Sequence, residues 1–410
     1  MHNSVTPIRV LSIIEAITVS GPARLLLDFC QVSQISEVQP PVSTSLATFV
    51  RGAAESASNQ FLEAMSAQGF KVHRIHERWA FDPRAISGLR RLSRELSPDV
   101  VETHGTKSHF LVRLSGIWRT CPWIAFHHGY TMDAKRTQLY NQLDRWSLRA
   151  PAAVVTVCEA FRRQLVRRGV SSHRITVLHN AVSPDWLHGA HNDNGVPPGA
   201  IAAGMPGQHT IIAVGRLSKE KAYADLISAM DHLRRLDPQL PVRLIVLGGG
   251  PERPTLERAV HSLKLSDRVL LLGHVSDVRP YFRIADALAI SSLSEGEPMV
   301  LLEAMAAGVP VAATAVGGIP DILTDHQTGL LVAPRNPRAM AEALIKLLHD
   351  KSLSDLLAQG AQKRIKSSFS AEARSRFLAQ LYERVCRGGQ RYRGEDTIDV
   401  ERDSTKGMCY

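Results

Sequence analysis

The chain has 410 residues, of which 44% are hydrophobic and 21% charged, and its formal net charge is +10. This length exceeds one ordinary hydrophobic core and favours two domains of about 150 to 200 residues each. No apolar run approaches the roughly 18 to 20 residues that a membrane span needs. The positive charge favours an anionic partner, which could be nucleic acid, an acidic lipid surface or a phosphorylated small molecule.

Sequence signatures narrow these classes further. Arginines cluster at 89–96 and 161–169 without interleaved aromatic residues, and no zinc-finger or RNP sequence is present, so we expect no nucleic-acid partner. The cysteines form no CxxC pair, which disfavours a disulfide framework or a zinc site. The apolar run 10–17 is short and contains Glu15, so it predicts a strand in a cytoplasmic protein and not a signal peptide.

Strand-like and helix-like stretches alternate along the first half of the chain. The β-branched apolar runs are 8–14, 100–105, 122–128, 153–158 and 175–180. Such alternation predicts a parallel sheet covered by helices on both faces. Residues 186–209 interrupt the rhythm with Gly, Pro, Asn and Asp, which makes them the best candidate for a linker.

The same rhythm then restarts and predicts a second open α/β domain. Its apolar runs are 210–215, 242–249, 269–275, 285–292, 309–314 and 329–334. An amphipathic helix and a polar tail, which we expect to be disordered, follow. The predicted parts are a first domain at 1–186, a linker at 187–204, a second domain at 205–369, a helix at 370–386 that returns to the first domain, and a tail at 387–410.

Open parallel sheets bind ligands beyond the carboxyl ends of their strands, where helix N-termini present unpaired N–H groups. Two such sheets facing a cleft suit a phosphate-bearing ligand. The sequence lacks both GxGxxG and GxxxxGK[ST], so a dehydrogenase and a P-loop NTPase are disfavoured.

The segment 290–314 carries the most chemical information. We expect a strand to end at Ser292, a loop to carry Glu295 and a helix to open at Pro298, where proline loses no needed N–H. The free N–H groups would be those of Met299, Val300 and Leu301. Glu303 is the only charged side chain of this apolar helix and needs a partner or a ligand hydroxyl. The alternative is a capping or ion-pair role for Glu303 and plain solvation for Glu295.

Glu295 and Glu303 reproduce the E-x7-E pattern, followed by EAMAAGVPV, and in this the chain resembles the retaining GT-B glycosyltransferases of family 4. Further stretches in the family's order include GRLSKEK, LIVLGGGPERPTLE, VLLLGHV, AVGGIPDIL and, in the first half, DVVETHG and AFHHG. The resemblance implies two Rossmann-like domains facing a cleft, with a nucleotide-sugar donor in the second and an acceptor in the first. It also implies retention of anomeric configuration and no cofactor or obligatory metal.

The resemblance assigns roles to residues of the second half. Arg216 and Lys221 follow Gly215 at the end of a strand, where two cations can neutralise a departing diphosphate. Glu303 matches the residue that holds the ribose, and Glu295 matches the one near the transferred sugar. The remaining donor-binding candidates are the backbone at Val275, which would pair with the nucleobase, and the helix start at Pro298, Met299 and Val300.

In the first half, Gly21 lies at a strand-to-helix turn with Pro22 as the expected first helical residue. This is a second helix start that can face an anion, which makes Gly21 a donor-binding candidate. His128 matches the family's histidine beside the transferred sugar, where an imidazole can hydrogen-bond a hydroxyl or accept charge. His127 is its competitor and His104 a lesser candidate.

We therefore expect a metal-independent retaining glycosyltransferase that acts on a saccharide, lipid-linked or small-molecule acceptor in cell-envelope polysaccharide or glycolipid synthesis. The basic stretches 89–96 and 161–169 would allow peripheral contact with an anionic membrane. Two alternatives stay open: a nucleotide-sugar 2-epimerase of the same architecture, and a non-catalytic sugar-nucleotide-binding protein.

Overall fold

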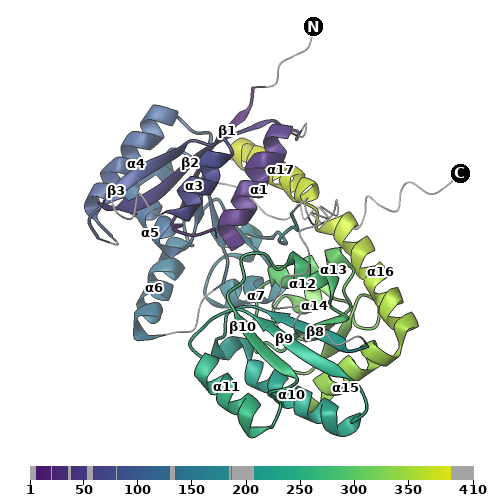
Figure 1. The fold of residues 1–410 in the computed structure, drawn as a ribbon. Coiled ribbons are helices and arrows are strands. Elements are labelled where there is room, and N and C mark those ends of the chain that lie inside the picture. Colours follow the sequence, from purple (N-terminus) through teal and green to yellow (C-terminus); the bar gives the residue numbers. More distant parts are fainter. Residues whose placement is uncertain are drawn as a thin grey trace, which may run out of the picture. The chain divides into compact units, whose positions relative to one another are not determined.

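The computed structural model describes residues 6–19, 21–35, 38–52, 59–79, 81–129, 134–183, 186 and 207–388. The predicted linker 187–204 lies outside the described residues, as does the predicted tail from residue 389 onward. The chain divides into two compact units, Met1–Ala181 with Ala371–Tyr410, and Val182–Ser370. Each unit contains an open parallel sheet covered by helices, so the predicted α/β class with two Rossmann-like domains is confirmed (Figure 1).

Seven parallel strands form the sheet of the first unit in the order β3-β2-β1-β4-β5-β6-β7. They are β1 (Ile8–Ile14), β2 (Val42–Arg51), β3 (Val72–Glu77), β4 (Val100–His104), β5 (Trp123–His127), β6 (Ala153–Thr156) and β7 (Ile175–Val177). Val10 of β1 lies beside Thr44 of β2 and Val100 of β4. The strand order reverses between β1 and β4, and a ligand crevice is expected beyond the carboxyl ends of these two strands.

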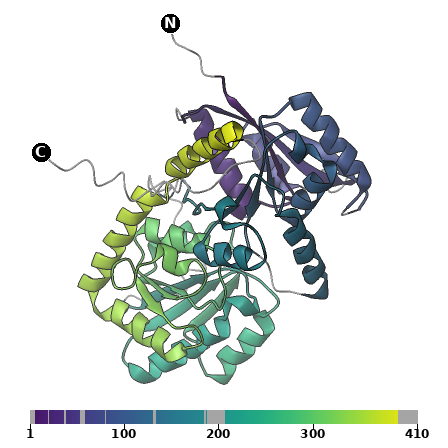
Figure 2. The same ribbon diagram turned by 180° about the vertical axis from the view of Figure 1, so that it is seen from behind.

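Helices cover both faces of this sheet. They are α1 (Gly21–Ile35), α3 (Gln60–Ala67), α4 (Pro83–Leu96), α5 (Thr106–Ser115), α6 (Ala134–Ser147), α7 (Glu159–Arg167) and α17 (Ala371–Gly388). Successive residues of a strand point to opposite faces. Leu11 accordingly shares a core cluster with Leu89 of α4, whereas Val10 shares another with Phe29 of α1 and Leu381 of α17. Figures 1 and 2 show α17 lying against α1 of the same unit.

Six parallel strands form the sheet of the second unit in the order β10-β9-β8-β11-β12-β13. They are β8 (His209–Val214), β9 (Val242–Leu247), β10 (Val269–Gly273), β11 (Ala287–Ile290), β12 (Val311–Thr314) and β13 (Leu330–Val332). Here the order reverses between β8 and β11. The loops that carry Arg216 and Glu295 follow these two strands, so the fold brings both loops to the expected crevice of the second sheet.

The helices of the second unit are α10 (Tyr223–Leu236), α11 (Arg253–Ser262), α12 (Arg279–Arg283), α13 (Met299–Ala307), α14 (Ile319–Ile322), α15 (Pro337–His349) and α16 (Lys351–Ser368). Ile211 of β8 packs with α10, α11 and α15, and Ile212 packs on the opposite face with α13, α14 and α16. Side chains fix two of the helix starts: Asn336 accepts from the N–H of Ala339, and Asp350 accepts from the N–H of Leu353. Among the helices described, none has both the length and the apolar character to span a membrane.

Candidate active site

Strand β8 ends in a turn that brings two glycines together. Gly215 and Gly248 have φ angles of 152° and 146°. A Cβ atom on Gly248 would lie 1.9 Å from the carbonyl oxygen of Gly215, so only glycine fits at that position. Arg216 follows directly, and its side chain is exposed.

An ion pair joins two of the predicted donor residues. Lys221 ends the short 3-10 helix η3 (Lys219–Lys221), and its Nζ lies 2.5 Å from Oε1 of Glu295. The hydroxyl of Ser292 donates to the same oxygen at 2.6 Å. The Glu295 side chain is 9% exposed and that of Lys221 is 22% exposed. The two charges therefore compensate each other at the carboxyl edge of the sheet.

Two hydrogen bonds hold the loop after β11 against η3. The Ser291 hydroxyl donates to the carbonyl of Lys221 at 2.9 Å, and the N–H of Leu293 donates to the carbonyl of Glu220 at 2.7 Å. The ion pair thus joins two segments that these hydrogen bonds already hold in place. Its formation therefore orders little further backbone.

The loop after β12 supports Glu295 from another side. Gly317 has a φ of 60°, and a Cβ atom there would lie 1.7 Å from the carbonyl oxygen of Glu295. The N–H of Gly318 donates to the carbonyl of Gly296 at 2.8 Å. Our sequence reasoning did not assign this role, although the glycine pair in AVGGIPDIL was the available signal.

The start of α13 differs from the prediction by one residue. Pro298 has an extended conformation with φ −71° and ψ 122°, so it is the N-cap, and Met299 is the first helical residue. The N–H of Leu301 is not free, because it donates to the carbonyl of Pro298 at 3.0 Å. Glu303 lies on α13 and is half-buried. Its proposed contact with a ribose stays a prediction.

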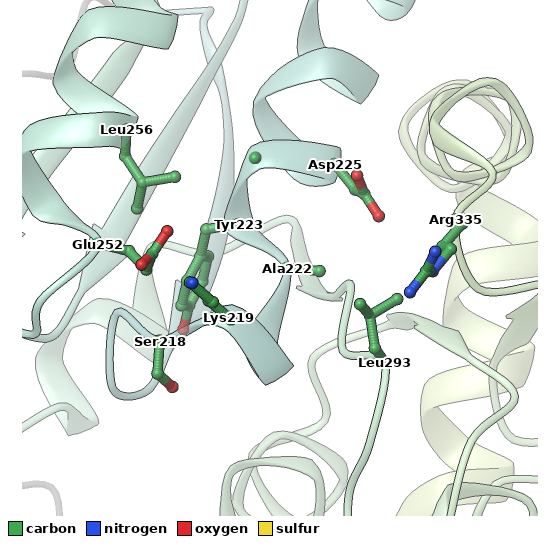
Figure 3. A pocket seen from close by; sticks show the side chains of 10 residues that line it. Ser218, Lys219, Ala222, Tyr223, Asp225, Glu252, Leu256, Leu293 and Arg335 are labelled. Atoms are coloured by element: carbon green, nitrogen blue, oxygen red, sulfur yellow. The ribbon is translucent and has the colours of Figure 1, made fainter. Parts of the chain in front are cut away.

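Two hollows flank η3. The smaller, of about 10 Å³, is lined by Lys221, Tyr223, Ser291, Ser292, Glu295 and Val300, with apolar residues of β8 and β11. The larger, of about 410 Å³, has Lys219 and Glu252 on one side and Asp225 and Arg335 on the other (Figure 3). None of the predicted donor residues lines the larger cavity. The paired cation and carboxylate, Lys221 and Glu295, both line the smaller hollow.

The backbone at Val275, predicted to pair with the nucleobase, lies two residues beyond β10. Its side chain is partly buried against the cluster that also contains Leu247 and Tyr281. The side chain therefore has a packing role. The predicted pairing of the Val275 backbone with the nucleobase stays a prediction.

The predicted histidine of the first unit lies in a buried polar network. His128 follows β5, and its Nε2 lies 3.3 Å from Nδ1 of His104. His104 in turn lies 3.3 Å from Oε1 of Glu102, whose other oxygen accepts from the hydroxyl of Tyr382 at 2.6 Å. His128 is half-buried, and its pKa is held well below the ordinary value, first by burial and then by its basic neighbours His104, His127 and Arg374. A neutral imidazole at this position can donate and accept a hydrogen bond.

His127, the competing candidate, has a different environment. It ends β5, is 3% exposed, and its Nδ1 lies 3.5 Å from Asp144. Asp144 also pairs with His109 at 2.6 Å. Burial lowers the pKa of His127, and Asp144 opposes this effect only in part. The structure therefore separates the two neighbouring histidines: His127 faces Asp144, and His128 faces His104.

Gly21 begins α1, so Pro22 is its second residue and not, as the sequence predicted, its first. A Cβ atom at Gly21 would meet nothing within 4 Å, so the available space does not require glycine there.

Sequence reasoning missed Glu102 and Tyr382. A signal for Glu102 was present, because it is a lone carboxylate within the apolar run of β4.

Two family models match the chain. The "Glycosyl transferase 4-like domain" matches residues 45–181, and "Glycosyl transferases group 1" matches residues 204–364. Among curated relatives, the D-inositol 3-phosphate glycosyltransferase of Salinispora arenicola is 38% identical over 170 residues, which cover 39% of this chain and 38% of that protein. The alignment thus spans well under half the length of that relative. The glycogen synthase of Mycobacterium tuberculosis is 26% identical over 320 residues, which cover 74% of each protein.

Solved structures show the same fold. The crystal structure of HepE from Anabaena in complex with UDP matches with a TM-score of 0.74 at 17% identity, covering 92% of this chain and 100% of that one. The same protein in complex with UDP-glucose matches with a TM-score of 0.71, at 17% identity and with 92% and 99% of the two chains covered. These likenesses confirm the predicted GT-B fold class. The chain belongs to the group 1, family 4-like glycosyltransferases.

Proposed function

We propose that this protein is a retaining glycosyltransferase that moves a sugar from a nucleoside diphosphate sugar to a hydroxyl-bearing acceptor. The observation that carries the proposal is the Lys221–Glu295 pair beyond strands β8 and β11, with the exposed Arg216 on the same loop after β8 as Lys221. A cation that can bind phosphate and a carboxylate that can bind sugar hydroxyls are adjacent at the edge where open sheets bind ligands.

The residues divide the work as follows. Arg216 and Lys221 bind the diphosphate and stabilise its charge as the bond to the sugar breaks. The N–H groups of Met299 and Val300 lie in the first turn of α13 and add the favourable field of a helix N-terminus. Glu295 binds the sugar, Glu303 the ribose, and neutral His128 a sugar hydroxyl. The departing diphosphate accepts the acceptor's proton on the same face of the sugar, which retains the configuration.

The donor class is supported by the relatives. HepE was crystallised with UDP and with UDP-glucose, which favours a nucleotide-sugar donor here. We propose that two cationic side chains replace the charge of a metal, so that transfer needs no divalent ion. The pathway we propose is synthesis of a cell-envelope polysaccharide or glycolipid.

Product analysis tests this proposal. The purified protein would be incubated with UDP-, GDP- and ADP-sugars and a lipid-plus-saccharide extract in EDTA, and products would be identified by mass spectrometry and NMR. We expect a glycoside with the donor's anomeric configuration. An inverted product refutes retention, and a strict Mg²⁺ requirement refutes metal independence. An epimerised donor formed without any acceptor favours the 2-epimerase, and binding without any product favours the binding protein.

We propose that the protein is cytoplasmic and contacts anionic membranes peripherally, and a basic groove of the first unit supports the membrane contact. A cavity of about 480 Å³ between β3 and α4 is lined by His73, Arg74, His76, Arg84, Arg91 and Arg94, and Glu95 is the one carboxylate among the described residues that line it. Leu89 and Leu92 point into the core, so the arginines of α4 lie on its outer side. This charge excess complements anionic phospholipid headgroups, each basic residue near such a surface contributing about 1 kcal/mol.

Vesicle sedimentation tests the membrane contact. We expect the protein to sediment with phosphatidylglycerol vesicles and not with phosphatidylcholine vesicles. Arg91→Glu/Arg94→Glu should abolish this binding, whereas Arg258→Glu, a charge reversal on α11 of the second unit, should leave most of it. Equal and negligible binding to both vesicle types refutes the contact.

A further inference from the structure

A chain of hydrogen bonds links His128 to buried polar side chains of the first unit. It starts at Tyr382 on α17, passes through Glu102 and His104 on β4, and ends at His128 after β5. The successive distances are 2.6 Å, 3.3 Å and 3.3 Å. Nothing in the proposed transfer requires three further polar groups to be buried behind the histidine, and burying them is costly unless each is satisfied.

Glu102 is an acceptor on both sides of its carboxylate. It is 1% exposed, and burial alone would raise its pKa. The hydrogen bonds from His104 and Tyr382 outweigh burial and hold the pKa of Glu102 below its ordinary value. The pKa of Tyr382 is raised well above its ordinary value, by burial and by the charge of Glu102. Tyr382 therefore keeps its proton and donates, and Glu102 offers only lone pairs to its neighbours.

When the His104 ring is neutral, the Glu102 carboxylate allows it only one tautomer. Its Nε2 must carry the proton that Glu102 accepts, so its Nδ1 carries a lone pair. The neighbour of that lone pair is Nε2 of His128, which must then be protonated, and the free lone pair of His128 falls on Nδ1. One buried charge thus determines the tautomer of a ring two hydrogen bonds away.

Ring stacking holds this arrangement in place. The His104 ring stacks on Phe126 with centroids 4.6 Å apart and an interplanar angle of 22°. The His128 ring lies at 5.6 Å from that of His104, with an angle of 17°. The adjoining cavity of about 10 Å³, lined among others by Arg374 and Leu378, has room for about one water molecule.

We propose that Glu102 is a positioning residue that fixes the Nε2–H tautomer of His128 through His104, so that His128 presents the Nδ1 lone pair to a ligand hydroxyl. The ligand part of this proposal rests on the proposed function, in which that hydroxyl belongs to the transferred sugar. The tautomer part concerns the free protein and stands without it.

Two-bond ¹H–¹⁵N spectra of the ¹⁵N-histidine-labelled full chain at pH 8 report the tautomer of each ring. His128→Gln identifies the signals of His128. In the native protein we expect a single His128 species with protonated Nε2 and unprotonated Nδ1. A mixture of tautomers, or a protonated Nδ1, overturns the proposal, and this measurement needs neither donor nor acceptor.

Two matched variants test the role of the charge. Glu102→Gln replaces an acceptor-only group with one that also donates, and we expect His128 to become a mixture of tautomers. Tyr382→Phe removes a hydrogen bond from the same buried carboxylate but keeps its charge, and we expect the single tautomer to remain. An unchanged His128 spectrum in Glu102→Gln overturns the proposal. If Glu102→Gln does not fold, His104→Asn breaks the same relay, with the same expected mixture and the same refuting result.

Kinetics then connects the tautomer to transfer. With a donor and acceptor in hand, Glu102→Gln should lower kcat by about tenfold, the size of one charge-assisted hydrogen bond, with little change in the KM of the donor. Tyr382→Phe should change kcat less than threefold. Native spectra as expected together with equal activity of both variants would retain the tautomer and refute its catalytic use. Absence of transfer in every form, including the native protein, would count against the proposed function alone.

Discussion

A diphosphate ligand and the Glu295 carboxylate compete for the ammonium group of Lys221. This competition leads to a specific prediction for Glu295→Gln. In the free protein Nζ of Lys221 lies 2.5 Å from the Glu295 carboxylate. A diphosphate that binds Lys221 must separate or share this pair. Removing the carboxylate charge while keeping the side chain's shape should therefore leave Lys221 more available, and the affinity for UDP should rise.

The size of the effect follows from the exposure of the pair. At 22% and 9% exposure the two side chains lie between a surface ion pair, worth about 0.2–1 kcal/mol, and a fully buried one. We take about 1 kcal/mol as the free energy needed to break this ion pair. UDP binding to Glu295→Gln does not have to supply that energy, so its Kd should be about fivefold lower. Ser292 keeps its hydrogen bond to the amide, so the loop should not rearrange.

Isothermal titration calorimetry with UDP in EDTA measures this change. Glu257→Gln is the matched control, because it removes the same charge from a pair with Arg253 on α11. We expect about fivefold tighter UDP binding for Glu295→Gln, unchanged binding for the control, and strongly reduced turnover for Glu295→Gln alone, since the sugar contact is lost. Weaker UDP binding by Glu295→Gln would refute the competition and indicate that the pair assembles the phosphate site.

The other predictions concern affinity, strain and acidity. Glu303→Ala should weaken UDP binding by about tenfold, as expected for one lost hydrogen bond to a charged group; unchanged calorimetric affinity would contradict a ribose contact. Gly317→Ala should destabilise the second unit by about 3 kcal/mol in urea unfolding, because its Cβ would lie 1.7 Å from a carbonyl oxygen at a φ of 60°; a loss under about 1 kcal/mol would contradict the close contact. The pKa of His128 is lowered on folding, so the unfolded chain binds the extra proton and stability falls as pH drops below about 6.5, by up to about 1.4 kcal/mol per pH unit. His128→Gln should flatten that slope, and an identical slope in both proteins would contradict the burial of a neutral ring.

The sequence predicted those parts of the fold whose hydrophobic pattern is local. Strands such as β9, in which all six residues are buried and all but Arg243 are apolar, stand out as apolar runs. β2 was missed because its first half alternates serine and threonine with apolar residues, and β3 was missed because it is a polar edge strand. The start of α13 was placed one residue early because the prediction treated Pro298 as helical, whereas its extended ψ makes it the cap.

In the candidate site, too, the residues with a local sequence signal were predicted, and those joined only by the tertiary fold were not. Glu295 and Lys221 could be named because each follows a recognisable strand end. The partnership of Glu102 with Tyr382 could not, because the two residues are separated by 280 positions and only the return of α17 brings them together. Long-range pairings of this kind leave no periodic trace in a sequence.

The return of α17 also sets the order in which the protein can mature on the ribosome. Leu378, Leu381 and Tyr382 fill the same core as Val10 and Val100, so the first unit lacks part of its interior until residues 371–388 have been synthesised. The second unit, Val182–Ser370, is complete in the chain before that helix emerges. The half that is translated first is therefore the half that finishes folding last, and its apolar face must stay protected from aggregation throughout elongation.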